Sequence, residues 1–211
     1  MDRSNPYEAA FEAYLTEQGL CYVGVDVKKR SLLAGTPVKN LDFIVLGLTG
    51  AKLLIDVKGR QFPGGPAGKE RYVWENWSTQ EDIRGLGHWM DLFGPGYLGL
   101  FVFLYHVLSS VELPADTPDL WHWQGARYLV RAVTVAEYSR HMKVRSPRWG
   151  TVGLPGAVFR DLARPFRYFS HEMPMEVAWE DDDQDRDLSA IMRLVDAPGA
   201  AGGTAAGSGR R

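Results

Sequence analysis

The chain has 211 residues, 45% of them hydrophobic and 12% aromatic, which is enough for one ordinary core and too little for two full domains. Its net charge of −2 conceals an asymmetry, because acidic residues concentrate after Glu172 and leave residues 1–171 mildly basic, a balance that permits phosphate binding without requiring it. One cysteine, Cys21, excludes an intrachain disulfide and a cysteine-rich zinc site, and no run of roughly 18 apolar residues exists to span a membrane.

The first helix is expected at about residues 6–18. Asn5 is a favourable N-cap, Pro6 suits the first helical position, and Gly19 ends the pattern. The apolar face consists of Tyr7, Phe11, Tyr14 and Leu15 at helical spacing.

Three strands are expected next, near Leu20–Val25, from about Leu41 to Leu46, and from Lys52 to about Gly59. The last two are separated by residues 48–50, which have the composition of a hairpin loop. Two neighbouring antiparallel strands are therefore expected at residues 41–59.

The remaining chain is expected to alternate between strands and helices. The expected segments are a mobile loop at 61–70, a helix from Ser78 or Thr79 to Gly94, a buried strand at Tyr97–Leu108, a strand near Tyr128–Val133, a helix near Val135–Met142, and an amphipathic segment near Pro155–Tyr168 that Pro165 interrupts. This order predicts an α/β (α+β) fold in which helices flank a mixed sheet. We expect one domain over residues 1–175 and a disordered tail over 176–211, acidic first and then rich in Gly and Ala.

One charged pair in the third expected strand has the residue types that phosphodiester hydrolysis needs. Alternate strand residues share a face, so Asp56 and Lys58 point the same way, with Cα atoms roughly 6.6 Å apart. A carboxylate can hold a divalent cation, and an ammonium group can stabilise the charge that develops on the phosphate oxygens.

The hairpin register decides whether Asp42 joins that face. A three-residue loop ending in Gly50 pairs Gly47 with Ala51 and sets Asp42 opposite Asp56, whereas a two-residue loop would send the two carboxylates to opposite faces. The three-residue loop requires a left-handed residue at its last position, which favours glycine. The turn therefore favours the register that builds a metal site, for which Mg²⁺ or Mn²⁺ suits the oxygen ligands. The backbone carbonyl of Val57 is a further candidate ligand.

Glu8 on the first helix, Asp42 at the start of a strand, and Asp56, Val57 and Lys58 on its hairpin partner together resemble the PD-(D/E)XK nucleases, and within them the Holliday-junction-resolvase-like group. The opening residues 6–12 also resemble the uncharacterised HYExAFE family, with Pro6 in place of its His. The resemblance covers roughly residues 5–108. Where the superfamily has a Pro before the first Asp, this chain has Leu41.

The resemblance implies a restriction-endonuclease-like fold and a metal-dependent endonuclease that acts on DNA. Asp42 and Asp56 are then expected to bind metal, and Glu8 is expected to help hold metal or water. Lys58 is expected to position the nucleophile or to stabilise the pentacovalent state. Resolvase-like relatives commonly form dimers, so the resemblance also implies a homodimer as one possible state of this chain. The single cysteine and the lack of a signal-peptide pattern favour a cytoplasmic location.

Several further residues are predicted to assist the site or to contact nucleic acid. Glu12, one turn after Glu8, and Gln80, at the start of the second helix, are auxiliary site candidates. Contact with nucleic acid is expected from Lys28, Lys29, Arg30 and Arg60, and further candidates are the cluster Arg140, Lys143, Arg145 and Arg148 and the aromatic residues Trp74 and Trp77.

Four alternatives stay open on the sequence. Glu8 at the third helical position has a structural alternative as part of a capping box with Asn5, and Gln80 and Asp82 have one as helix caps. The whole protein has a second interpretation as a catalytically inactive module that binds nucleic acid or a protein partner. In a third, the charges form an ordinary structural ion-pair network.

Overall fold

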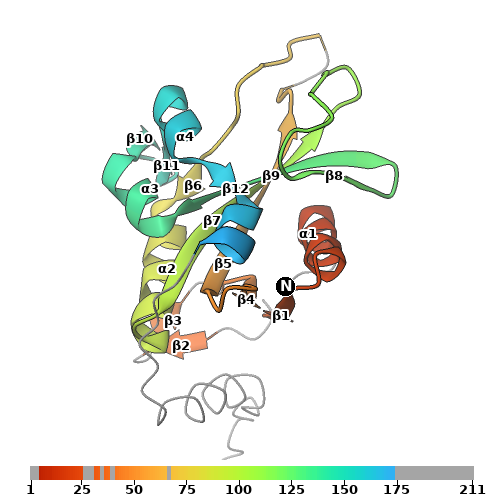
Figure 1. Cartoon of the computed structure of the whole chain (residues 1–211). Coiled ribbons are helices and arrows are strands. Elements are labelled where there is room, and N and C mark those ends of the chain that lie inside the picture. Colours follow the sequence, from red (N-terminus) through yellow and green to blue (C-terminus); the bar gives the residue numbers. More distant parts are fainter. Residues whose placement is uncertain (1–4, 26–30, 34–35, 39–40, 66–67, 174–211) are drawn as a thin grey trace, which may run out of the picture. The chain divides into compact units, whose positions relative to one another are not determined.

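The structure is a computed structural model that describes residues 5–25, 31–33, 36–38, 41–65 and 68–173 (Figure 1). The predicted domain boundary at 175/176, the predicted tail, and the basic residues Lys28, Lys29 and Arg30 lie outside these ranges. No helix within the ranges is long and apolar enough to cross a membrane.

A mixed sheet forms the centre of the fold. Its strands run in the order β1 (Cys21–Gly24), β4 (Phe43–Leu46), β5 (Lys52–Phe62), β7 (Tyr97–Val107), β9 (Ala126–Thr134) and β12 (Arg164–Pro165), and β8 (Leu120–Trp123) also pairs with β9. Only the β5–β7 pair is parallel, and the other pairs are antiparallel. The apolar segment predicted as a central strand is β7, which lies between β5 and β9.

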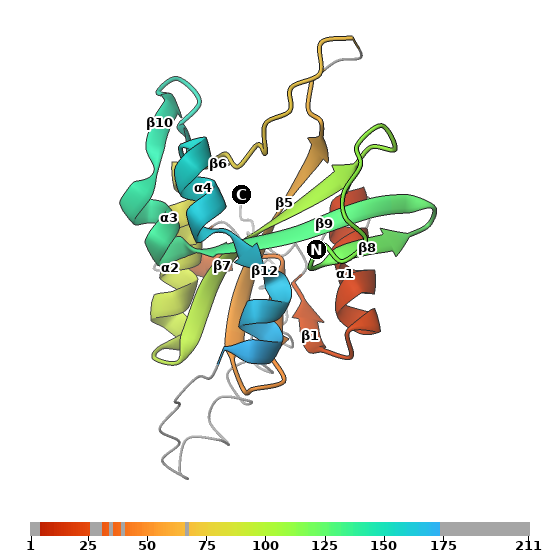
Figure 2. The same ribbon diagram turned by 45° about the horizontal axis from the view of Figure 1, so that its top comes forward.

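Helices cover both faces of this sheet (Figure 2). One core cluster lies between the sheet and α1 (Pro6–Glu17), and the short π-helix η1 (Tyr168–Glu172) adds Phe169 to it. The other cluster lies beneath α2 (Gln80–Phe93), α3 (Val135–His141) and α4 (Gly156–Leu162). The expected α/β class, with helices flanking a mixed sheet, is confirmed.

Some elements were not predicted. They are a small sheet of β10 (Lys143–Ser146), β11 (Thr151–Gly153) and β6 (Ser78–Thr79), a ribbon of β2 (Ser31–Leu33) and β3 (Thr36–Val38), and strand β8. The predicted loop at 61–70 was also wrong at its start, because β5 continues to Phe62. Parallel pairing with β7 extends to Phe62 opposite Val107, so tertiary hydrogen bonding carries the strand into the segment whose Gly and Pro content predicted a loop.

Candidate active site

The hairpin between β4 and β5 sets the spacing of the two predicted metal-binding aspartates. Phe43 pairs with Ile55. The loop is closed by a 2.7 Å hydrogen bond from the Gly47 N–H to the Ala51 carbonyl, and Gly50 has a φ of +87°. Because glycine adopts this left-handed conformation without a Cβ penalty, Gly50 stabilises the three-residue loop. The predicted register is confirmed.

Asp42 and Asp56 lie close together at the end of the paired residues. The described pairing of β4 with β5 ends at Phe43 and Ile55, and the Asp42 N–H donates to the Ile55 carbonyl at 2.8 Å. The Val57 N–H donates to Asp42 Oδ2, which places this carboxylate beside the residue that follows Asp56. The arrangement meets the first requirement for a shared metal ion.

Asp42 has a strongly raised pKa. Burial, followed by the negative charges of Asp56 and Glu8, raises its pKa to about 8, although the Val57 N–H and Lys58 act in the opposite direction. The Val57 N–H donates to Asp42 Oδ2 at 2.7 Å. Without a further cation, Asp42 therefore retains its proton at neutral pH.

Val57 presents its backbone to the same place. In a strand, the N–H and C=O groups of one residue project to the same side. Because the Val57 N–H is directed at Asp42, its carbonyl oxygen is directed to that side too. The backbone direction is compatible with the predicted role of this carbonyl as a metal ligand, and that role stays a prediction.

Lys58 is held between two carboxylates. Its Nζ lies 2.7 Å from Asp56 Oδ1 and 3.0 Å from Asp82 Oδ2, and its side chain is only 12% exposed. Burial lowers the pKa of Lys58, but the charges of Asp56 and Asp82 outweigh that effect and leave the pKa raised. Lys58 is therefore a fixed, charged ammonium group on the carboxylate face.

Asp82 also belongs to the site, although the sequence did not predict its contact with Lys58. It was expected to cap the second helix, and it does so in a capping box with Thr79. Its Oδ2 also accepts a hydrogen bond from Ser78 Oγ at 2.8 Å. No local pattern signals the contact with Lys58, because that contact arises only when the start of α2 packs beside β5.

Glu8 lies at the start of α1 and is 7% exposed. The side-chain amide of Asn5 donates to Glu8 Oε1 at 2.8 Å, while Asn5 Oδ1 accepts the Tyr7 N–H and so caps the helix. The contact with Asn5 gives Glu8 part of the structural role that the sequence left open. Its charge nevertheless acts on Asp42, so Glu8 belongs electrostatically to the carboxylate group.

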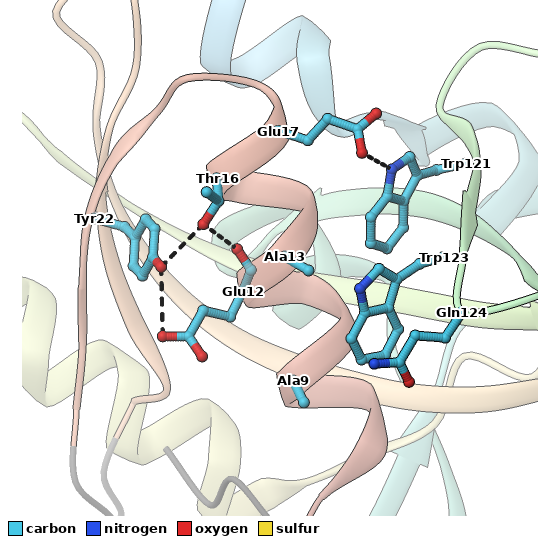
Figure 3. A pocket seen from close by; sticks show the side chains of 9 residues that line it. All are labelled: Ala9, Glu12, Ala13, Thr16, Glu17, Tyr22, Trp121, Trp123 and Gln124. Atoms are coloured by element: carbon cyan, nitrogen blue, oxygen red, sulfur yellow. Dashed lines mark hydrogen bonds between the residues drawn. The ribbon is translucent and has the colours of Figure 1, made fainter.

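The two auxiliary candidates are not drawn into this group. Glu12 is among the lining residues of a separate pocket of about 740 Å³, where its side chain turns toward Tyr22 and away from Trp121 and Trp123 (Figure 3). There its carboxylate accepts a 3.4 Å hydrogen bond from the Tyr22 hydroxyl. Gln80 is the exposed first residue of α2. The geometry gives neither auxiliary role any support.

Arg60, predicted to contact nucleic acid, already has a structural role. Its guanidinium group lies 3.9 Å from the centre of the Trp77 ring and donates to the carbonyl groups of Trp77 and, at 2.7 Å, of Gly59. Burial lowers the pKa of Arg60. Arg60 therefore anchors the segment before β6 to β5, and a DNA contact from it stays a prediction.

The position of Glu8 depends on the close approach of α1 to Gly59. A Cβ atom at Gly59 would lie 2.7 Å from Tyr7 Cβ, so G59A forces α1 away from β5. We expect this substitution to lower the free energy of unfolding by roughly 1–3 kcal/mol, as overpacking does, and to reduce any activity that requires Glu8. Urea unfolding with G87A as the control measures this effect, because a Cβ at Gly87 in α2 meets no atom within 4 Å. Equal stability of the two variants would contradict the dependence on Gly59.

The donor set fits a hard divalent cation in its chemistry, since carboxylate and carbonyl oxygens are the ligands that Mg²⁺ and Mn²⁺ prefer. Among the described residues, no three His, Cys, Asp or Glu side chains are already grouped to hold a metal ion. The ion pair of Asp56 with Lys58 accounts for part of this, because it directs that carboxylate toward the ammonium group. Metal binding therefore requires Asp56 to share or exchange this partner.

The fold and these side chains define a mixed α/β domain with a buried site of carboxylates and one lysine. No protein-family model and no curated protein matches the chain. Among solved structures, the chain is similar to a Holliday junction resolvase from the archaeal hyperthermophile Archaeoglobus fulgidus, at 11% sequence identity and a TM-score of 0.42, over 74% of this chain and 91% of the resolvase. At this distance the likeness does not define a function, and the chemistry has to follow from the site's own residues.

Proposed function

We propose that the chain is a Mg²⁺- or Mn²⁺-dependent nuclease of the PD-(D/E)XK type that hydrolyses DNA phosphodiester bonds. The observation that carries this proposal is the position of Asp42, a carboxylate whose pKa is raised by burial and by Asp56 and Glu8. Lys58 lies two residues after Asp56 and forms an ion pair with it. Hydrolysis of a phosphodiester uses carboxylates that bind a metal ion and a cationic group that stabilises the negative charge developing on the phosphate.

The environment of Asp42 favours a bound cation over a structural ion-pair network. Its carboxylate is buried, and the charges of Asp56 and Glu8 act on it and raise its pKa to about 8. Buried carboxylates that lie close together lose hydration and repel one another. A divalent cation bound beside Asp42 would relieve this repulsion and release the proton that Asp42 otherwise retains.

Each residue then has a distinct task. Asp42 and Asp56, with the Val57 carbonyl, would hold the ion, which would polarise the scissile phosphate and lower the pKa of bound water. Lys58 directs a positive charge at the phosphate oxygens on which negative charge grows. Glu8, at the start of α1, orients the attacking water or accepts its proton.

A nicking assay tests the activity directly. Supercoiled plasmid and a synthetic four-way DNA junction are incubated with the full chain in Mg²⁺, in Mn²⁺ and in EDTA. We expect nicked or resolved products only with a divalent ion. Absence of cleavage with both metals on both substrates would contradict the nuclease proposal. Sedimentation of the same preparation establishes whether the chain pairs as a homodimer, as the resemblance implies.

Two observations favour a second candidate, a non-catalytic module of the same fold that binds nucleic acid. Lys58 already neutralises Asp56, and the described residues contain no preformed cluster of metal ligands. Binding of DNA without cleavage in any metal would support this candidate. Metal titration by calorimetry separates the two further, since only the nuclease needs a site for the ion.

A further inference from the structure

A groove of about 450 Å³ lies on the α2 side of the protein, and its lining includes Trp74, Lys143 and Arg145, which the sequence marks as candidates for contact with nucleic acid. Its walls come from the segment before β6, from β10, and from the residues that join β11 to α4. These elements lie side by side in both ribbon views (Figures 1 and 2). The residues that matter for its chemistry are Arg71, Trp74, Glu75, Asn76, Lys143 and Arg145.

The groove is basic. Arg71, Lys143 and Arg145 are all exposed, and none of them forms an ion pair with another described residue. The acidic residue in the lining, Glu75, accepts a hydrogen bond from Trp77 Nε1 at 3.3 Å. The three cationic groups are thus available to an anionic ligand that enters the groove.

The floor of the groove is rigid. Asn76, which is 6% exposed, accepts the Leu154 N–H at 2.8 Å and donates to the Leu154 carbonyl at 3.2 Å. The Tyr138 hydroxyl donates to the Asn76 carbonyl at 2.7 Å, and Trp74 stacks on Phe62 with ring centres 3.5 Å apart. These contacts fix the groove before any ligand binds, so less conformational entropy is lost on binding.

The arginine on the opposite wall is also positioned by the backbone. A Cβ atom at Gly153 would lie 3.1 Å from Arg145 Cδ, so the absence of a side chain there lets the Arg145 stem lie across β11. The guanidinium group therefore extends from a supported stem, and less conformational freedom is lost when it contacts a phosphate.

The groove is connected to the proposed active site through a short stretch of chain. Ser78, two residues after Asn76, donates to Asp82, the carboxylate that pairs with Lys58. Burial raises the pKa of the Tyr138 hydroxyl, the charge of Arg145 lowers it, and the charge of Asp82 raises it further. The Tyr138 hydroxyl is therefore close enough to interact electrostatically with both the groove and the proposed active site. Lys58 is therefore linked to the segment that lines the groove through Asp82 and Ser78.

Two exposed aromatic side chains belong to the segments that form the walls. Tyr72, adjacent to Arg71, is 67% exposed, and Trp149, in the turn between β10 and β11, is 70% exposed with the Arg148 guanidinium 5.3 Å from its ring centre. Exposed aromatic rings beside cationic groups stack on unpaired bases, whereas the bases of a duplex are already stacked on one another.

We infer that this groove binds an unpaired DNA strand and guides it to the carboxylate site. The inference rests on the proposed function and narrows its substrate to DNA with single-stranded segments, such as tails or branch points. Arg71, Lys143 and Arg145 contact the phosphates, and Tyr72 and Trp149 stack on bases.

Fluorescence anisotropy in EDTA tests this inference without any need for catalysis. A labelled single-stranded 20-mer and its duplex are titrated with the full chain at several salt concentrations. We expect tighter binding of the single strand. In R71Q/R145Q, affinity should fall by at least about tenfold at low salt, and the slope of log affinity against log salt should become shallower by about 1.4, the value for two lost contacts to single-stranded phosphates.

The aromatic contribution has a different signature. W149A should weaken binding by about tenfold and leave the salt slope unchanged, because stacking involves no counterion release. The matched control is R164Q/R167Q, which removes two exposed charges that do not line the groove and should bind as the wild type does. Circular dichroism verifies that each variant is folded.

The outcomes separate this inference from the proposed function. The inference would be overturned if the groove variants bind single strands as the wild type does. It would also be overturned if the wild type binds duplex as tightly as the single strand, or binds neither. Each of these results would count against the groove even if plasmid is nicked. Groove-dependent binding of single strands, with no cleavage in Mg²⁺ or Mn²⁺, would support the groove and reject the nuclease.

Discussion

Replacing Asp56 with asparagine is expected to reduce Mg²⁺-dependent DNA cleavage by about 10³-fold, because it removes a charged oxygen ligand at the centre of the site. Asparagine retains the shape of the side chain and the packing around β5. The effect is measured as the rate of plasmid nicking at saturating metal. D91N, which neutralises an exposed aspartate on α2, is the control and should cleave like the wild type.

Replacing Lys58 with methionine should have an effect of similar size for a different reason. Methionine keeps the length of the stem but removes the ammonium group that lies 2.7 Å from Asp56 and 3.0 Å from Asp82. Loss of one preorganised charge that stabilises the transition state costs roughly 10²–10³-fold in rate. Metal affinity should be retained or increased, since Asp56 is released from its partner. Cleavage that survives both D56N and K58M would remove the catalytic assignment.

D82N separates a positioning role from a catalytic one. Asparagine at this position can still accept the Ser78 and Thr79 hydrogen bonds that begin α2, whereas the charge that holds Lys58 is lost. We expect a loss of activity smaller than that of K58M and a shift of the alkaline limb of the pH profile to lower pH, because the pKa of Lys58 is raised in part by Asp82. An unchanged pH profile would indicate that Asp82 serves only as a cap.

The parts of the site that could be predicted from sequence are those fixed by local geometry. The register of the β4–β5 hairpin, which brings Asp42 near Asp56, follows from one turn, because Gly50 permits a left-handed residue at the end of a three-residue loop. The start of α2 follows in the same way from Thr79 and its capping box. Both signals lie within a few residues of the feature that they specify.

The parts that could not be predicted arise from contacts between distant segments. Asp82 reaches Lys58 only because α2 packs beside β5, and nothing in the residues around either position encodes that distance. The groove requires β10 and β11 to lie against the segment before β6, where Asn76 bonds to Leu154 across 78 residues of sequence. Arg60 was expected on a DNA-binding surface, but its stacking on Trp77 likewise depends on tertiary packing.

Raising the pH from about 5 to about 8 in metal-free buffer is expected to destabilise the protein by an amount on the order of a few kcal/mol. In the unfolded chain Asp42 titrates near its ordinary pKa of 3.8, whereas burial and the charges of Asp56 and Glu8 raise its pKa to about 8 in the folded protein. Between these values the folded state retains a proton that the unfolded state has lost, so stability falls as the pH rises. Above about pH 8 this contribution no longer changes with pH.

Urea unfolding at a series of pH values measures this dependence, and two comparisons identify its origin. D42N cannot ionise at this position, so its stability should be nearly flat over the window and should exceed that of the wild type at pH 8. Mg²⁺ should stabilise the wild type most at pH 8, where Asp42 loses its proton on binding the ion, and should have little effect on D42N. A pH dependence that is the same in both proteins would place the titrating group elsewhere. Stabilisation of D42N and wild type to an equal extent by Mg²⁺ would show that the ion does not bind at Asp42.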